Sequence, residues 1–143
     1  MLTSEVTYIG NLRTKAKHVA SGTEIITDAP IDNHGKGEYF SPTDLAATAF
    51  ASCILTIMGI GSETYKYNMD GTRVEVTKIM GTNPRRIAEI KASFYFPNFG
   101  FTKKQKDILI HIIDTCPVAL SLHPDIKKVI VFIFNDETIN VSL

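Results

Sequence analysis

The sequence predicts a single α+β domain over residues 1–143, and three observations support this fold class. Short segments of alternating apolar and polar residues open the chain and recur in its second half, which is typical of β-strands. Two longer segments, near residues 41–62 and 102–116, have the start signals and apolar spacing of helices. With 143 residues, 44% of them hydrophobic, one domain can bury a core of its own. The predicted order is βββ-α-ββ-α(α)-β.

The first thirty residues predict a meander of three short antiparallel strands. Turn residues separate the strands at Gly10-Asn11 and at Ser21-Gly22, and Pro30 follows the last one. The strands are expected at Val6 to Ile9, Leu12 to Val19 and Glu24 to Thr27.

The next element is predicted to be a buried helix. Ser41 is a good N-cap, Pro42 suits the first helical position, and Asp44 places a carboxylate in the first turn. The stretch from Leu45 to Ser62 is uncharged and is apolar or small on every side, so we expect cover from all directions. Its length suits a membrane span, but its threonines, serines and glycines favour burial within protein. Gly59 and Gly61 are expected to end it, and covering it in so small a domain suggests a partner subunit.

The second half predicts two strands, a helix with a possible short extension, and a last strand. The segments 74–79 and 90–96 alternate around an Asn83-Pro84 turn. Thr102 and Gln105 have capping-box spacing and start the second helix, which Pro117 ends or kinks. The uninterrupted apolar run 129–134 predicts a strand inside a sheet.

Charge and composition argue against several classes of function. The formal net charge is zero, so we expect no affinity for nucleic acid or an anionic membrane. The first residues, Met1 to Glu5, contain no signal-peptide pattern, so a cytoplasmic location is expected. Two cysteines with scattered histidines make a poor zinc site, and we expect neither a metal nor a bound cofactor.

The two cysteines are the candidate chemistry of the chain. Cys53 lies well inside the apolar helix, so its thiolate would need a nearby cation, most plausibly Arg13 from the N-terminal strands. Cys116 precedes Pro117, where the amides of a new helical turn would favour a thiolate, so on local grounds it is the better candidate for a low pKa. The alternative is that both are ordinary buried core residues.

Three segments resemble the OsmC/Ohr family of thiol-dependent peroxidases, and the order of elements is also similar over nearly the whole chain. They are Phe40-Ser41-Pro42-Thr43-Asp44-Leu45 through Ser52-Cys53, Cys116-Pro117-Val118, and Leu122-His123-Pro124.

The resemblance implies a mechanism, a set of residues and an assembly. Cys53 would attack an organic hydroperoxide and become a sulfenic acid, Cys116 would condense with it to a disulfide, and a thiol reductant would reopen the bond. This assignment reverses the local ranking of the two thiols. The family fold is an intertwined homodimer with antiparallel sheets around central buried helices, and it implies a role in antioxidant stress response.

The residues that support the cysteines depart from the family pattern. Related hydroperoxide resistance proteins carry a glutamate just after the helix-starting proline, paired with an arginine on an N-terminal strand. Here Thr43 takes that position and Asp44 follows it, so Asp44 is the candidate to orient Arg13. The alternative explanation for Asp44 is that it caps the helix.

Three functions stay open at this point. The first is a peroxidase acting through Cys53 and Cys116 with the help of Arg13, Thr43 and Asp44. The second is a non-catalytic dimeric binding protein that holds an apolar or electrophilic small molecule between its subunits. The third is a purely structural dimer.

Overall fold

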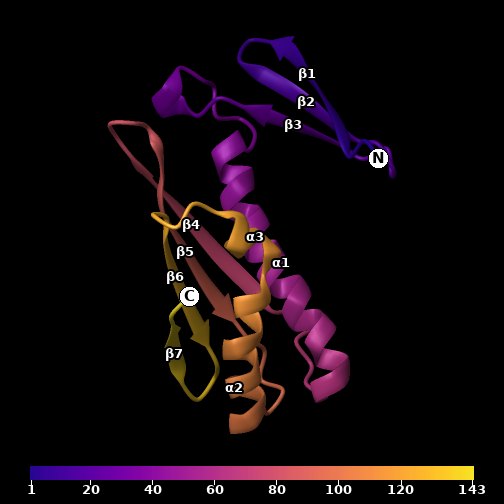
Figure 1. Cartoon of the computed structure of the whole chain (residues 1–143), viewed down its shortest axis with the longest axis vertical. Coiled ribbons are helices and arrows are strands. Elements are labelled where there is room, and N and C mark those ends of the chain that lie inside the picture. The colour runs from indigo at the N-terminus through magenta and orange to yellow at the C-terminus, as the bar shows by residue number, and fades with distance from the viewer. The chain divides into compact units, whose positions relative to one another are not determined.

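The computed structural model describes all residues 1–143 and has the predicted α+β class. The chain divides into two compact units, Met1–Ala46 and Ala47–Leu143. Figure 1 shows the elements of both units, coloured in chain order.

The first unit contains a three-stranded antiparallel sheet in the order β1-β2-β3. Its strands are β1 (Ser4–Gly10), β2 (Arg13–His18) and β3 (Glu24–Asp28), so the predicted meander is confirmed. The β2–β3 register pairs Arg13 with Asp28. Several large apolar side chains of this unit, among them those of Val6, Tyr8 and Ile25, are exposed.

Helix α1 runs from Pro42 to Tyr65, and its start is the predicted one. The Ser41 hydroxyl accepts a hydrogen bond from the Asp44 amide at 3.1 Å, and the Asp44 carboxylate accepts one from the Ser41 amide at 2.9 Å. The prediction that Gly59 and Gly61 end the helix is wrong. Both residues keep helical geometry, because a glycine weakens a helix without breaking it.

One face of α1 is not covered within the chain, although the sequence predicted cover on every side. Ser52 and Thr56 are exposed, and Ile60 is 70% exposed. By length and hydropathy alone α1 could cross a membrane. This is weak support for a membrane span, since the core helix of a soluble protein meets the same criterion.

The second unit is built on a four-stranded sheet in the order β4-β5-β6-β7. Its strands are β4 (Arg73–Gly81), β5 (Arg86–Tyr95), β6 (Lys127–Ile133) and β7 (Thr138–Val141), and β7 was not predicted. β5 and β6 are parallel, so this sheet is mixed rather than wholly antiparallel. A parallel pair needs a crossover, and the segment with α2 and α3 provides it.

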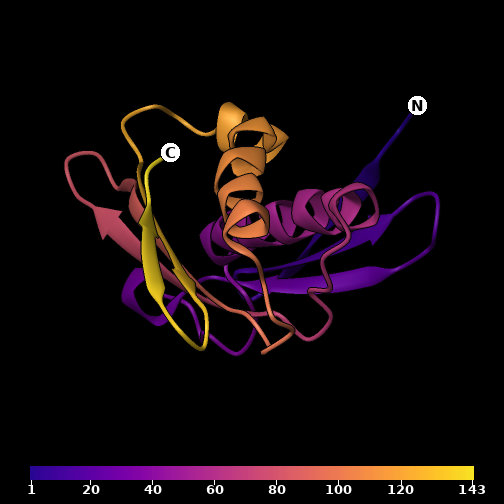
Figure 2. The same ribbon diagram turned by 90° about the horizontal axis from the view of Figure 1, so that it is seen from below.

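The helices of the second unit lie on one face of this sheet (Figure 2). They are the part of α1 from Ala47 onward, α2 (Lys103–Ile112) and α3 (Pro117–Ser121), and a 3₁₀ turn at Ile113–Thr115 joins α2 to α3. The predicted capping box of Thr102 and Gln105 starts α2. The core between helices and sheet includes the fully buried Ile54, Phe94 and Phe132. Buried side chains alternate along β5 and β6, as expected for strands with one face against helices.

Gly61 is the point of close approach between α1 and α2. A Cβ atom at Gly61 would lie 2.6 Å from the Ile112 Cδ1 atom and 2.7 Å from the Tyr67 hydroxyl. That hydroxyl donates a hydrogen bond to the Met58 carbonyl at 2.5 Å. The absence of a side chain at Gly61 therefore sets how closely α2 packs on α1.

Candidate active site

The structure brings Cys53 and Cys116 together in the second unit. Cys53 lies on α1 and is half-buried, whereas Cys116 is the N-cap of α3 and is 0% exposed. Both are free thiols, and Cys53 is a neighbour of Cys116 close enough to contribute to the raised pKa of that thiol. Of the two sulfurs, that of Cys53 is thus the more accessible to a molecule in solution.

The surroundings of Cys116 keep its thiol protonated. Burial is the main cause that raises the pKa of Cys116, and the hydrogen bond with Cys53 raises it further. The backbone amides of Ala119 and Val118 act in the opposite direction, and the Ala119 amide donates to the Cys116 Sγ atom at 3.4 Å. The local argument for a low pKa at Cys116 correctly identified these amides but not the burial that outweighs them.

Arg13 is held in the first unit by two carboxylates. Its Nε and Nη2 atoms donate to the two oxygens of Asp28 at 3.1 and 3.2 Å, and Nη2 also contacts Glu38. The Asp28 side chain is 0% exposed, and it accepts the Glu38 amide at 3.0 Å as well. These donors, Arg13 first, hold the pKa of Asp28 below its usual range, although burial alone would raise it.

Asp44 does not orient Arg13, because the carboxylates that contact Arg13 are Asp28 and Glu38. Asp44 caps α1 through Ser41, and the Thr43 hydroxyl lies 3.1 Å from the Ser41 hydroxyl. Asp28 and Glu38 were missed at the sequence level. Counting outward from the Ser21-Gly22 turn would place Arg13 opposite Pro30, whereas the observed register places it opposite Asp28. The sequence therefore offered no direct signal for Asp28 or for Glu38.

A pocket of about 250 Å³ lies in the first unit beside this ion pair. It combines hydroxyl groups with an apolar wall, which suits a small amphipathic molecule. Its lining residues include Tyr8, Leu12, Thr14, Thr27, Pro30 and Pro42.

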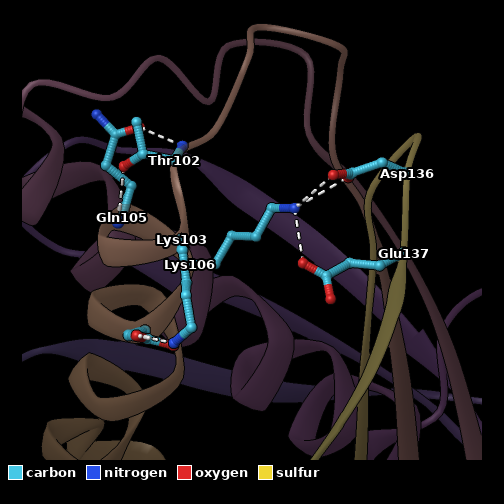
Figure 3. Close-up of polar contacts among 7 residues, drawn as sticks. Thr102, Lys103, Gln105, Lys106, Asp136 and Glu137 are labelled. Carbon is cyan, nitrogen blue, oxygen red and sulfur yellow. Dashed lines mark hydrogen bonds and ion pairs between the residues drawn. The ribbon is translucent and has the colours of Figure 1, made fainter.

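A second charged cluster lies in the second unit, where Lys106 of α2 meets the turn between β6 and β7 (Figure 3). The Lys106 amine donates to both Asp136 oxygens at 2.9 and 3.0 Å and to Glu137 at 2.7 Å. The amine also lies 4.7 Å from the centre of the Phe134 ring. The side chain is only 7% exposed, so the cluster ties the helix to the turn. Its bonds with Glu137 and then Asp136 raise the pKa of Lys106.

The sequence of the chain has a counterpart among known families. A family model described as OsmC-like protein matches residues 35–130, more than half of the chain and a range that includes both cysteines. The chain belongs to the OsmC family. The search of curated proteins found no match to this sequence.

Solved structures of OsmC-like proteins share the fold over nearly the whole chain. An osmotic stress induced and detoxification response protein from Psychrobacter arcticus is 50% identical, with a TM-score of 0.88, and the match covers 93% of this chain and 96% of that one. An organic hydroperoxide resistance protein OsmC from Legionella pneumophila is 12% identical, with a TM-score of 0.68 and coverage of 92% and 97%. An organic hydroperoxide resistance protein from Elizabethkingia anophelis is 18% identical, with a TM-score of 0.68, and the match covers 94% of this chain and 98% of that one. The last two show a shared fold alone.

Proposed function

We propose that this OsmC-family protein is a thiol-dependent peroxidase that reduces organic hydroperoxides through a Cys53 sulfenic acid and a Cys53–Cys116 disulfide. One observation supports it above all: a half-buried thiol and a buried thiol, 63 positions apart in sequence, are neighbours in the structure. Membership of a family that includes hydroperoxide resistance proteins supports the substrate class and a role in stress response.

The proposed reaction has three balanced steps. The Cys53 thiolate attacks the terminal oxygen of the hydroperoxide, the O–O bond breaks, and the alkoxide leaves and takes up a proton as an alcohol. The Cys116 thiol then attacks the Cys53 sulfenic acid, so that an S–S bond forms and water leaves. A dithiol reductant returns both thiols by exchange and is itself oxidised to a disulfide.

Arg13 is the cation that we propose to stabilise the Cys53 thiolate. Two carboxylates already offset its charge in the first unit, but Glu38 is exposed while Asp28 is buried. The buried Asp28 therefore fixes one side of the guanidinium, and the Glu38 contact is the one that an incoming anion can replace. We propose the supporting role of the family's glutamate for Asp28 in place of Thr43 or Asp44.

We further propose a homodimer. Exposed apolar side chains on β1 and β3, together with Ile60 on the uncovered face of α1, form surfaces that favour burial against a second copy. The expected assembly is a stable dimer at micromolar concentration, and sedimentation velocity measures it directly. A protein that stays monomeric at that concentration would contradict this part of the proposal.

The peroxidase proposal is tested with the purified protein, an alkyl hydroperoxide and a dithiol. Wild-type protein is expected to consume the peroxide, and Cys53→Ser is expected to abolish consumption, with Thr56→Ser on the same helix as a control that leaves it intact. After one equivalent of peroxide without reductant, mass spectrometry should show loss of two hydrogens across the peptides with Cys53 and Cys116. Full activity of Cys53→Ser would refute the assignment.

The second candidate function is ligand binding without redox chemistry, and the pocket in the first unit favours it. In that case a small amphipathic ligand would bind equally well to wild type and to Cys53→Ser, and one equivalent of peroxide would produce no disulfide. The same mass-spectrometric measurement therefore separates the two functions.

A further inference from the structure

The guanidinium of Arg13 is held along one edge and left open along another. Its Nε and Nη2 atoms donate to the two oxygens of the buried Asp28 carboxylate, at 3.1 and 3.2 Å. Nη2 also contacts Glu38, whereas Nη1 donates to no group of the chain. Two bonds to one carboxylate set the direction of a guanidinium, but they still allow it to tilt about the line that joins the two oxygens.

The ring of Tyr39 limits this tilt. The Cζ atom of Arg13 lies 5.0 Å from the centre of the ring. A guanidinium at this distance is attracted by the negative charge density on the face of an aromatic ring. Tyr39 is 48% exposed, so its ring is not part of the apolar core, and the guanidinium is the cation that it contacts.

The segment that carries Tyr39 is fixed to Asp28 by backbone hydrogen bonds. The Glu38 amide donates to the Asp28 carboxylate, and the Asp28 amide donates to the Phe40 carbonyl, both at 3.0 Å. Tyr39 therefore lies between two residues that are bonded to the same aspartate. The aspartate that holds one edge of the guanidinium also fixes the backbone on both sides of the ring.

We propose that Tyr39 is a positioning residue for the peroxidase chemistry, because its ring holds the Arg13 guanidinium with the edge formed by Nη1 and Nη2 available to an anion. The inference rests on the proposed function, in which that anion is the Cys53 thiolate. Tyr39 acts through Arg13 and takes no part in the reaction itself.

An aromatic ring suits this role better than a third carboxylate would. Asp28 and Glu38 already place two negative charges beside one positive charge. A further carboxylate would repel an incoming anion, since like charges disfavour each other at short range. A neutral ring attracts the guanidinium without adding to the net charge of the site.

The test compares Tyr39→Leu, which removes the ring, with Tyr39→Phe, which keeps the ring and removes the hydroxyl. The readout is the rate at which iodoacetamide alkylates Cys53 at neutral pH, measured by mass spectrometry of the peptide that contains Cys53. This rate rises with the thiolate fraction. We expect Tyr39→Leu to slow it by about twofold to fivefold, the range of a cation–π contact at an exposed position, and Tyr39→Phe to restore it. In an Arg13→Gln background, Tyr39→Leu should have no further effect, because the ring then has no guanidinium to hold.

Alkylation of Tyr39→Leu at the wild-type rate, or an equal loss in the Arg13→Gln background, overturns the inference and leaves the proposed function standing. If Arg13→Gln alone leaves the alkylation rate unchanged, the proposed role of Arg13 is contradicted, and the inference fails with it. Because alkylation uses no peroxide, a protein without peroxidase activity can still show the effect.

Thermal unfolding verifies that the variants fold. Arg13→Gln leaves the buried Asp28 without its main partner, and if this variant does not fold, the NMR signal of the Arg13 Nε–H group decides without it. Exchange of this proton with solvent should be faster in Tyr39→Leu than in wild type and Tyr39→Phe, because the guanidinium tilts away from Asp28 more often. Equal exchange in all three proteins overturns the inference.

Discussion

Substitution of Gly61 by alanine tests whether the close packing of α2 on α1 holds the two thiols together. The new methyl group would lie 2.6 Å from Ile112 Cδ1 and 2.7 Å from the Tyr67 hydroxyl. Carbon atoms in contact prefer separations of about 3.5–4.0 Å, so both neighbours must move by about 1 Å. Ile112 can rotate, whereas the Tyr67 hydroxyl is tied to the Met58 carbonyl.

The expected cost follows from three contributions. Alanine is favoured over glycine within a helix by about 1 kcal/mol. Overpacking costs about 1–3 kcal/mol, and loss of the Tyr67 hydrogen bond costs about 1 kcal/mol more. We therefore expect Gly61→Ala to lower the free energy of unfolding by about 1–3 kcal/mol. The 3₁₀ turn that ends at Thr115 follows α2 directly and leads to Cys116, so disulfide closure after a peroxide pulse should slow by about tenfold or more.

Urea unfolding measures the stability, and quenched mass spectrometry measures the closure rate. Tyr67→Phe supplies the matched background, because it removes the hydroxyl that the new methyl group meets. In that background the cost of Gly61→Ala is expected to fall by about 1 kcal/mol. A Gly61→Ala protein as stable as wild type, with unchanged closure, would refute this account of the packing.

Two further predictions concern the charged clusters. Arg13 lowers the folded-state pKa of Asp28, so the pair stabilises the protein above the unfolded pKa of about 3.9, and this contribution is lost as the pH falls through the folded-state value. Asp28→Asn should therefore be less stable than wild type at pH 6 and lose less stability between pH 4 and pH 2 in urea titrations; parallel pH profiles would count against the pairing. Lys106→Met keeps an aliphatic chain against Phe134 and removes a buried charge whose partner Asp136 is exposed, so its Tm should stay within about 3 °C of wild type. Lys106→Ala should lower the Tm further by calorimetry, and the reverse order would contradict the packing role.

The features that the sequence predicted correctly depend on local chemistry. The caps of α1 and α2 involve residues three positions apart, so Ser41 with Asp44 and Thr102 with Gln105 could be recognised directly. The strand β6 was recognised because a strand inside a sheet is apolar on both faces.

The features that it missed depend on distant parts of the chain. Gly61 looks like a helix end, yet the packing of Ile112 and Tyr67 makes it an interior position. The four residues of β7 are too few for a pattern, and the strand exists because β6 pairs with it. Identifying Asp28 as a partner of Arg13 requires the register of the β2–β3 pairing, which the composition of the two segments does not give.

The spacing of the two cysteines in the sequence did not predict that they are neighbours either. No local rule places Cys53 against Cys116, and the resemblance to a family supplied that pairing before the structure was known. Local reasoning did identify the amides at Cys116, but it expected a low pKa there, whereas burial, which it could not see, raises the pKa of Cys116.

The parallel pairing of β5 with β6 has a consequence for the newly made chain. Cys116 lies on the crossover between these strands, whereas Cys53 lies on a helix that is complete about fifty residues earlier in synthesis. Under the proposed chemistry, a ribosome-bound chain that has emerged only to β5 carries a nucleophile without its resolving partner. Peroxide that reaches such a chain can drive Cys53 beyond the sulfenic acid to irreversible products. Under that chemistry, the oxidant that a finished molecule would remove would be most damaging to copies still being translated.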